Sequence, residues 1–273
     1  MRVPVLTYHG LNVNGTDYAS NDHVALREDL ALIRRLGWRV APLQRLVSAV
    51  VDRRPADLER AVAITFDDGA WFDWHDLDHP SHGPQPSLAR LLREHRALAG
   101  GHAGDVHATS FVIVSPDARA ILDRTCMVGR GWWGDEWWPE AVAEGLLAIE
   151  SHSWDHNHDT LPATAQRDGR KGTFRNIDTW AEADQEVRQA SAWLDRRCPG
   201  RRTTLFAYPY GEWSEYLVRE YLPLRADEHG LRAAFTTEAA PVEATSDRWL
   251  LPRYVCGHHW RAPGELEAIL RGG

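Results

Sequence analysis

Three short polar strings, each at the end of an apolar run, constrain the fold of this chain most strongly. The strings are TFDDG at residues 65–69, HSWDH at 152–156 and FAYPYG at 206–211. The apolar residues that precede them have the length and composition of buried strands. Parallel α/β folds gather the carboxyl ends of their strands at one edge of the sheet, so we expect the three strings to lie close together there.

Apolar runs alternate with amphipathic stretches along most of the 273 residues, and this pattern favours an α/β architecture with parallel strands. The expected strands are 3–8, 61–66, 108–114, 146–150, 203–208, 233–237 and 249–255. The expected helices are 22–36, 87–98, 138–144 and 177–194.

Two stretches, 71–86 and 115–137, have turn residues, several aromatic side chains and no clean period. We expect both to form long loops over the strand ends, where loops of this length are often functional. No internal repeat or interdomain linker is visible, so the sequence predicts a single catalytic domain over residues 1–273.

The overall charge and hydropathy exclude some partners. A formal net charge of −8 argues against nucleic acid as a ligand, because binding to phosphates needs a basic face. No apolar run approaches the roughly 18 residues of a membrane span. The first residues show no basic region followed by an apolar region, so we expect a cytoplasmic location, although a trimmed secreted chain would look the same.

The ionisable residues of the strings match the needs of a hydrolytic metal site. Asp67 and Asp68 stand in the first string, and His152 and His156 stand in the second. Two imidazoles and one carboxylate with an open position are the ligand set that activates water on a metal ion, and a neighbouring carboxylate supplies a base. Taken alone each string has a plain interpretation as a turn, but together they indicate an amide or ester hydrolase.

These strings resemble the motifs of the polysaccharide deacetylases, the family 4 carbohydrate esterases. TFDDG is similar to the first motif of that family, in which the first Asp is the general base and the second binds the metal. HSWDH is similar to the second motif, whose histidines are the other two ligands. The resemblance implies a distorted (β/α) barrel of about seven parallel strands with the active site at their C-terminal ends.

The third string departs from the common pattern of that family, which is Arg-Pro-Pro-Tyr-Gly. Ala207 and Tyr208 precede Pro209 here, so the arginine that orients the catalytic Asp is missing. A subgroup of exopolysaccharide deacetylases carries a similar Tyr-Pro-Tyr-Gly string, and LPRYV at 251–255 also resembles that subgroup. Arg253 is therefore the candidate substitute; the alternative is that it pairs with a surface carboxylate.

The acid that protonates the leaving group is harder to place. The family's last motif, Leu-x-His, has no clear counterpart, and His258 and His259 are the best candidates, although either could be a solvated loop residue. His9 follows the first expected strand and is a candidate contact to a metal ligand or to the substrate. A further group could bind a second metal or simply lie in a solvated loop: Asp73, His75, Asp76, Asp78, His79 and His82.

The resemblance implies the following function. One divalent ion, Zn²⁺ with Co²⁺, Mn²⁺, Ni²⁺ or Fe²⁺ as alternatives, is held by Asp68, His152 and His156. Asp67 is the base, and the backbone N–H of Tyr210 binds the oxyanion. The substrate is an N-acetylated, amino-sugar-containing glycan that releases acetate. Two alternatives remain open, namely a related metal-dependent hydrolase of a smaller amide, imide or ureide, and an inactive carbohydrate-binding relative.

Overall fold

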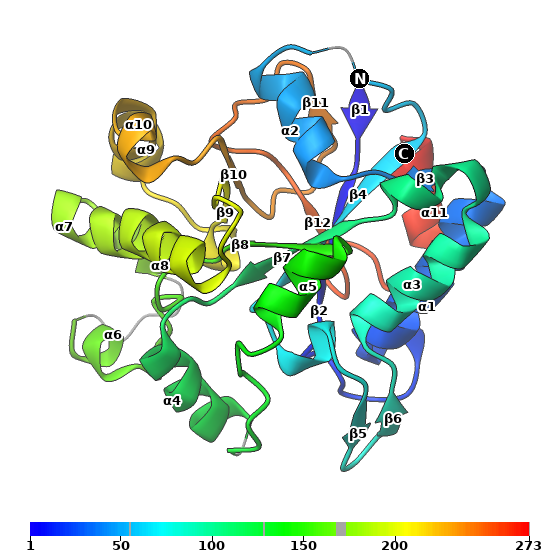
Figure 1. Ribbon diagram of the computed structural model, residues 1–273, viewed down its shortest axis with the longest axis horizontal. Coiled ribbons are helices and arrows are strands. Elements are labelled where there is room, and N and C mark those ends of the chain that lie inside the picture. Colours follow the sequence, from blue (N-terminus) through cyan, green and yellow to red (C-terminus); the bar gives the residue numbers. More distant parts are fainter. Residues whose placement is uncertain (55, 128, 168–172, 273) are drawn as a thin grey trace.

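A curled parallel sheet forms the centre of the computed structural model, which describes residues 1–54, 56–127, 129–167 and 173–272 (Figure 1). Its strands follow the order β10-β9-β8-β7-β4-β2-β12, and β3 pairs with β4 beside this path. The bounds are β2 Val5–His9, β3 Arg39–Val40, β4 Ala61–Asp67, β7 Ala108–Val112, β8 Leu147–Ser151, β9 Leu205–Ala207, β10 Ala233–Phe235 and β12 Tyr254–Val255.

The segment 251–255 joins the two edges of this sheet. Leu251 forms a parallel bridge with Phe235 of β10, and β12 pairs with β2 at the other edge. Seven parallel strands therefore curl into a distorted barrel, and the predicted fold is confirmed.

Helices surround the barrel, and short strands decorate it. The helices are α1 Asp22–Arg35, α2 Leu43–Val51, α3 Leu88–Leu98, α4 Pro116–Cys126, α5 Trp138–Glu144, α6 Pro162–Arg167, α7 Trp180–Ala183, α8 Ala190–Arg197, α9 Leu222–Leu224, α10 Ala226–His229 and α11 Pro263–Arg271. The remaining strands are β1 Arg2–Val3, which pairs with β11 Val242–Glu243, and the hairpin of β5 Leu77–His79 and β6 Gly83–Gln85. Among the described helices, none is long and apolar enough to cross a bilayer.

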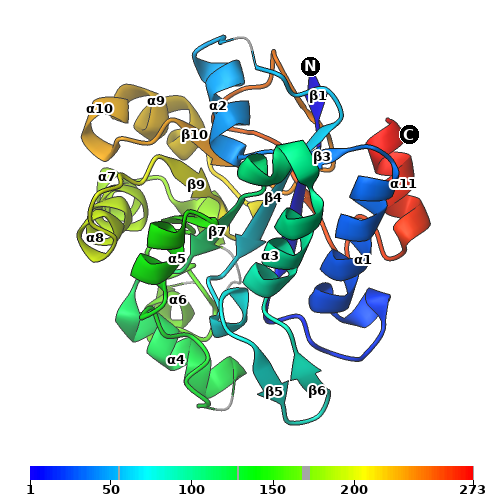
Figure 2. The same cartoon turned by 45° about the vertical axis from the view of Figure 1, so that its right-hand side comes forward.

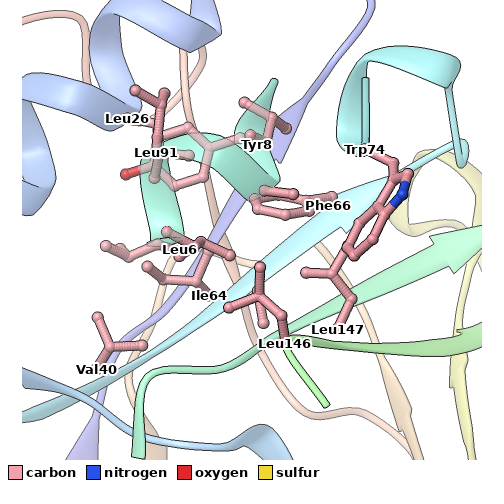
Figure 3. Packing of buried hydrophobic residues seen from close by; sticks show 14 of the residues in the cluster. Leu6, Tyr8, Leu26, Val40, Ile64, Phe66, Trp74, Leu91, Leu146 and Leu147 are labelled. Carbon is pink, nitrogen blue, oxygen red and sulfur yellow. The ribbon is translucent and has the colours of Figure 1, made fainter. Parts of the chain in front are cut away.

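Strand alternation separates two layers of core. Leu6, Tyr8, Ile64 and Phe66 pack outward beneath the surrounding helices (Figure 3). The residues between them along β2 and β4, such as Val5 and Ala63, belong to a second cluster, which fills the barrel. Because side chains of a strand alternate between its faces, Thr65 and Asp67 share the inner face with Ala63. This register points Asp67 into the carboxyl end of the barrel.

The two stretches without a clean period contain regular structure. Residues 71–86 hold a short 3-10 turn, Trp71–Asp73, followed by the β5–β6 hairpin, and 115–137 holds α4. Helix α4 begins after Ser115, whose hydroxyl accepts the N–H of Ala118, and Pro116 occupies its first position. This serine–proline start is a helix signal that the search for periodicity overlooks. In Figure 2 the hairpin and α4, which follow the carboxyl ends of β4 and β7, lie at the end opposite α2.

Candidate active site

The carboxyl ends of β4 and β8 bring three candidate metal ligands together. Asp68 directly follows β4, and His152 and His156 follow β8. Asp68 Oδ1 lies 3.7 Å from His152 Nε2 and 3.6 Å from His156 Nε2. One ligand atom from each of the three residues falls within 4.8 Å of the others, and the described residues contain no other group of this kind.

A hydrogen bond selects the tautomer of His152. Its Nδ1 lies 2.8 Å from the backbone oxygen of Ala207, at the end of β9. A carbonyl oxygen only accepts, so Nδ1 carries a proton, and in the neutral imidazole that binds a metal the lone pair is then on Nε2, the nitrogen nearer Asp68. Metal-binding histidines are commonly held in this way by a carbonyl or carboxylate partner.

The donor set fits a small divalent cation. Ligand atoms about 2.0–2.2 Å from a tetrahedral Zn²⁺ lie about 3.4 Å from one another, close to the separations of Asp68 Oδ1 from the two imidazoles. Both separations exceed a hydrogen bond. Asp68, His152 and His156 could therefore hold the ion, with two nitrogen donors and one oxygen donor.

Strained backbone gathers at the same place. Asp68, His156 and Tyr210 have φ values of 76°, 65° and 55°. A left-handed conformation costs a non-glycine residue about 1–2 kcal/mol, and such strain concentrates at functional sites. Gly69 also has φ of 73°, and a Cβ there would lie 2.5 Å from Val112 Cγ1, so only glycine fits beside Asp68.

Asp67 and Arg253 form a buried ion pair under this cluster. The two guanidinium nitrogens Nη1 and Nη2 of Arg253 donate to Oδ1 and Oδ2 of Asp67 at 2.7 and 2.8 Å. Nε of Arg253 donates to the carbonyl of Thr236 at 3.1 Å. Burial alone raises the pKa of Asp67, but Arg253, followed by His152, outweighs it and lowers this pKa to about 2. Arg253 thus pairs with the buried Asp67 and not with a surface carboxylate.

The third string places Tyr210 beside His156. Their rings meet edge to face with centroids 4.6 Å apart. Gly211 has φ of 71°, and a Cβ there would lie 2.7 Å from the backbone nitrogen of Thr237, so this turn requires glycine. The turn thereby holds the ring of Tyr210 against the imidazole of His156.

His258 and His259 lie beyond the end of β12. The Nδ1 atom of His259 accepts the N–H of Val255, and its ring contacts Tyr254 and His258. His258 is exposed. Within the described part of the chain, no hydrogen bond, ion pair or ring contact joins either histidine to the metal-ligand cluster.

His9 occupies a position inside the barrel. It lies opposite Asp67 in the β2–β4 ladder, and its backbone N–H donates to Asp22 Oδ2 at 2.7 Å. Its Nδ1 is buried and has no hydrogen-bond partner among the described residues. Charge on His9 also contributes to the lowered pKa of Asp67.

The histidine and aspartate group of residues 73–82 does not assemble into a second cluster. Asp73 is buried and accepts from Ser110, whereas Asp76 pairs with Arg90. His79 stacks on His82 with ring centroids 4.8 Å apart. The metal-ligand cluster is the only such group in the described residues.

Two residues that support the candidate site, Glu186 and Trp133, were not predicted from the sequence. Glu186, buried in a π-helical turn, accepts the backbone N–H groups of Trp154 and Asp155 at 3.1 and 3.4 Å and so braces the turn between the two histidines. Trp133, in the loop after α4, donates its indole N–H to the carbonyl of Asp68 at 3.0 Å. Each contact joins distant parts of the chain, so no local sequence pattern predicts it.

Comparison with models of known protein families shows which family this chain belongs to. The family model described as polysaccharide deacetylase matches residues 55–229, which is more than half of the chain. The chain belongs to the polysaccharide deacetylase family. The match spans β4 with Asp67 and Asp68, the second string and the third string of this deacetylase-family protein. A comparison with curated proteins finds no match.

Solved structures share the fold. The deacetylase PplD of Streptococcus pyogenes, solved in complex with acetate, is similar with a TM-score of 0.67 and 16% identity over 99% of this chain and 98% of its own. IcaB from Ammonifex degensii gives 0.66 and 21%, over 99% and 97%. A de-N-acetylase from Aggregatibacter actinomycetemcomitans gives 0.60 and 15%, over 98% and 100%. At these identities the likeness establishes the fold alone.

Proposed function

We propose that this member of the polysaccharide deacetylase family is a metal-dependent hydrolase that removes N-acetyl groups from an amino-sugar-containing glycan and releases acetate. The observation that carries the proposal is that the Asp68–His152–His156 cluster lies beside the Asp67–Arg253 pair, with His152 Nε2 3.8 Å from Asp67 Oδ2. A divalent ion bound there would supply a Lewis acid for the acetamide carbonyl and for water.

Asp67 is the proposed general base. The bidentate contact with Arg253 keeps its carboxylate ionised and fixes its direction. A carboxylate with so low a pKa is an intrinsically weak base, so its contribution must come from position and from the acidity of the water it deprotonates. Tyr210 is proposed to direct its backbone N–H at the developing oxyanion.

The Arg253 contact also supports the proposed subgroup. In the common third motif an arginine orients the catalytic Asp, and this chain has Ala207 and Tyr208 in that stretch. Arg253 would do the same from the segment beside β12. We propose on this basis that the protein resembles the exopolysaccharide deacetylases with a Tyr-Pro-Tyr-Gly string. The description of one similar structure as a de-N-acetylase agrees with an N-acetyl substrate.

Acetate release from a panel of N-acetylated glycans tests the proposal. We expect acetate from at least one amino-sugar glycan, its loss after chelation, and its return on addition of Zn²⁺, Co²⁺ or Mn²⁺. The panel should include small amides, imides and ureides as a separate arm. Turnover in that arm alone would replace the glycan proposal, and binding of glycans with no turnover under any metal would indicate an inactive relative.

For the leaving-group acid, the positions of the histidines favour His9 over His258 and His259. His9 shares the barrel interior with Asp67, and a proton donor typically contributes about 10²–10⁴-fold. We expect His9→Gln to lower kcat on an N-acetyl substrate by about 100-fold or more with unchanged metal content. On 4-nitrophenyl acetate, whose leaving group needs no proton, the loss should largely vanish.

The matched controls are His258→Gln and His259→Gln, for which we expect near-normal turnover of both substrates. If one of these two variants showed the substrate-dependent loss and His9→Gln did not, the acid would be assigned to the C-terminal pair instead.

A further inference from the structure

The backbone of Asp68 has an unfavourable conformation, and two hydrogen bonds from other parts of the chain hold its carbonyl group. Its φ of 76° is followed by a φ of 73° at Gly69, so two successive residues are left-handed. The carbonyl oxygen of Asp68 accepts two hydrogen bonds, from the backbone N–H of Ile113 at 3.3 Å and from the indole Nε1 of Trp133 at 3.0 Å. Both donors come from parts of the chain that lie after β7.

The direction of the Asp68 carboxylate depends on this peptide. In the left-handed conformation Oδ1 faces Nε2 of His152 and Nε2 of His156. Relaxation of the peptide toward the ordinary right-handed or extended regions would rotate Cβ and carry the carboxylate away from the two imidazoles. Of the two donors, the indole of Trp133 makes the shorter bond and the only one from a side chain.

Trp133 is itself firmly seated. The residue is 7% exposed and packs with Ile113 and Leu122. The buried guanidinium of Arg119 donates to the backbone carbonyl of Trp133 at 2.8 Å and pairs with Asp135. A chain of contacts therefore runs from this ion pair through Trp133 to Asp68.

We propose that Trp133 is a positioning residue for the metal centre, and that its indole N–H holds the strained carbonyl of Asp68 so that the carboxylate faces the two histidines. This inference rests on the proposed function, because it takes Asp68 to be a metal ligand. It adds a residue from the loop after α4 to the machinery of the site. Partners of this kind, which touch a ligand and not the metal, typically change metal affinity by about 10–100-fold.

The test compares Trp133→Phe with Trp132→Phe. Trp132 is the matched control because it is adjacent, is 9% exposed, and forms hydrogen bonds with Asp123 and Trp71 through its backbone. The dissociation constants for Zn²⁺ and Co²⁺ are measured by chelator competition, and the visible absorption spectrum of the Co²⁺ form reports the geometry around the ion. Asp68→Ala is the reference for a lost ligand.

We expect Trp133→Phe to raise the dissociation constant about tenfold and to alter the Co²⁺ spectrum, while Trp132→Phe stays within about twofold of the parent with its spectrum unchanged. A purely structural role for Trp133 would leave the spectrum of the folded, loaded variant unaltered. If Trp133→Phe fails to fold, β-(3-benzothienyl)alanine at position 133 preserves the ring shape and removes only the N–H, with the same expectation.

The four possible results have different meanings. Parent-like affinity and spectrum in the Trp133→Phe protein would overturn the inference, and so would equal losses in both tryptophan variants, which would indicate general packing. Failure of the parent protein to bind either ion would instead contradict the metal centre of the proposed function. Loss confined to position 133 supports the positioning role.

Discussion

Asp67→Asn should lower kcat for acetate release by about 10²–10⁴-fold while the enzyme keeps its metal. The amide is nearly isosteric with the carboxylate but cannot take a proton from water. Asp68, His152 and His156 are unchanged in this variant, so the proposed metal ligands remain. Acetate release gives kcat, and elemental analysis gives the metal content of the same sample.

The same substitution should also reduce stability, because Arg253 is fully buried and would lose its charged partner. Removal of one member of a buried ion pair costs about 3–5 kcal/mol. Asp76→Asn is the matched control, since Asp76 makes a half-exposed ion pair with Arg90 and should change the free energy of unfolding by less than about 1 kcal/mol. Retention of most of the parent kcat by Asp67→Asn would assign the base to another residue.

The second large effect is expected for Arg253. Arg253→Ala removes both hydrogen bonds that orient Asp67, and burial then favours the protonated carboxyl. We expect kcat to fall by at least about 100-fold with little change in metal content. Arg253→Lys should fall between the parent and the alanine variant, because an ammonium supplies charge without the two-pronged contact.

Arg219 offers the control for this prediction. It pairs with Asp247 at 3.3 Å on the surface, with both side chains at least 40% exposed, so Arg219→Ala should be nearly neutral in turnover and stability. The kcat of each variant should be measured on samples that are loaded with metal and that near-ultraviolet circular dichroism shows to be folded. Near-normal turnover in such an Arg253→Ala sample would remove Arg253 from the catalytic machinery.

Local patterns in the sequence predicted a parallel α/β architecture, and the resemblance of the three strings to a known family predicted that the sheet closes into a barrel. The strand β4 ends at Asp67 because an unbroken apolar run gives way to Asp-Asp-Gly, and parallel strands of a curled sheet open their carboxyl ends on one side. That geometry brings Asp68 close to His152, although 84 residues separate them along the chain. The sequence predicted the bounds of the short strands poorly and did not predict α4. The bounds of these elements depend on neighbouring strands and on helix caps more than on apolar periodicity.

The apolar pattern and the strand ends, which are local properties of the chain, therefore predicted a parallel sheet with the three strings at one edge. The resemblance of those strings to the deacetylase motifs predicted the curling of the sheet into a barrel and the choice of Asp68, His152 and His156 as candidate metal ligands. Only the tertiary structure decided which residues serve the metal-ligand cluster. Arg253 reaches Asp67 across 186 residues, and Trp133 reaches Asp68 across 65. Such partners are selected by distance and direction in the closed barrel, where a buried charge or a strained carbonyl must be satisfied by whichever donor the fold brings near it.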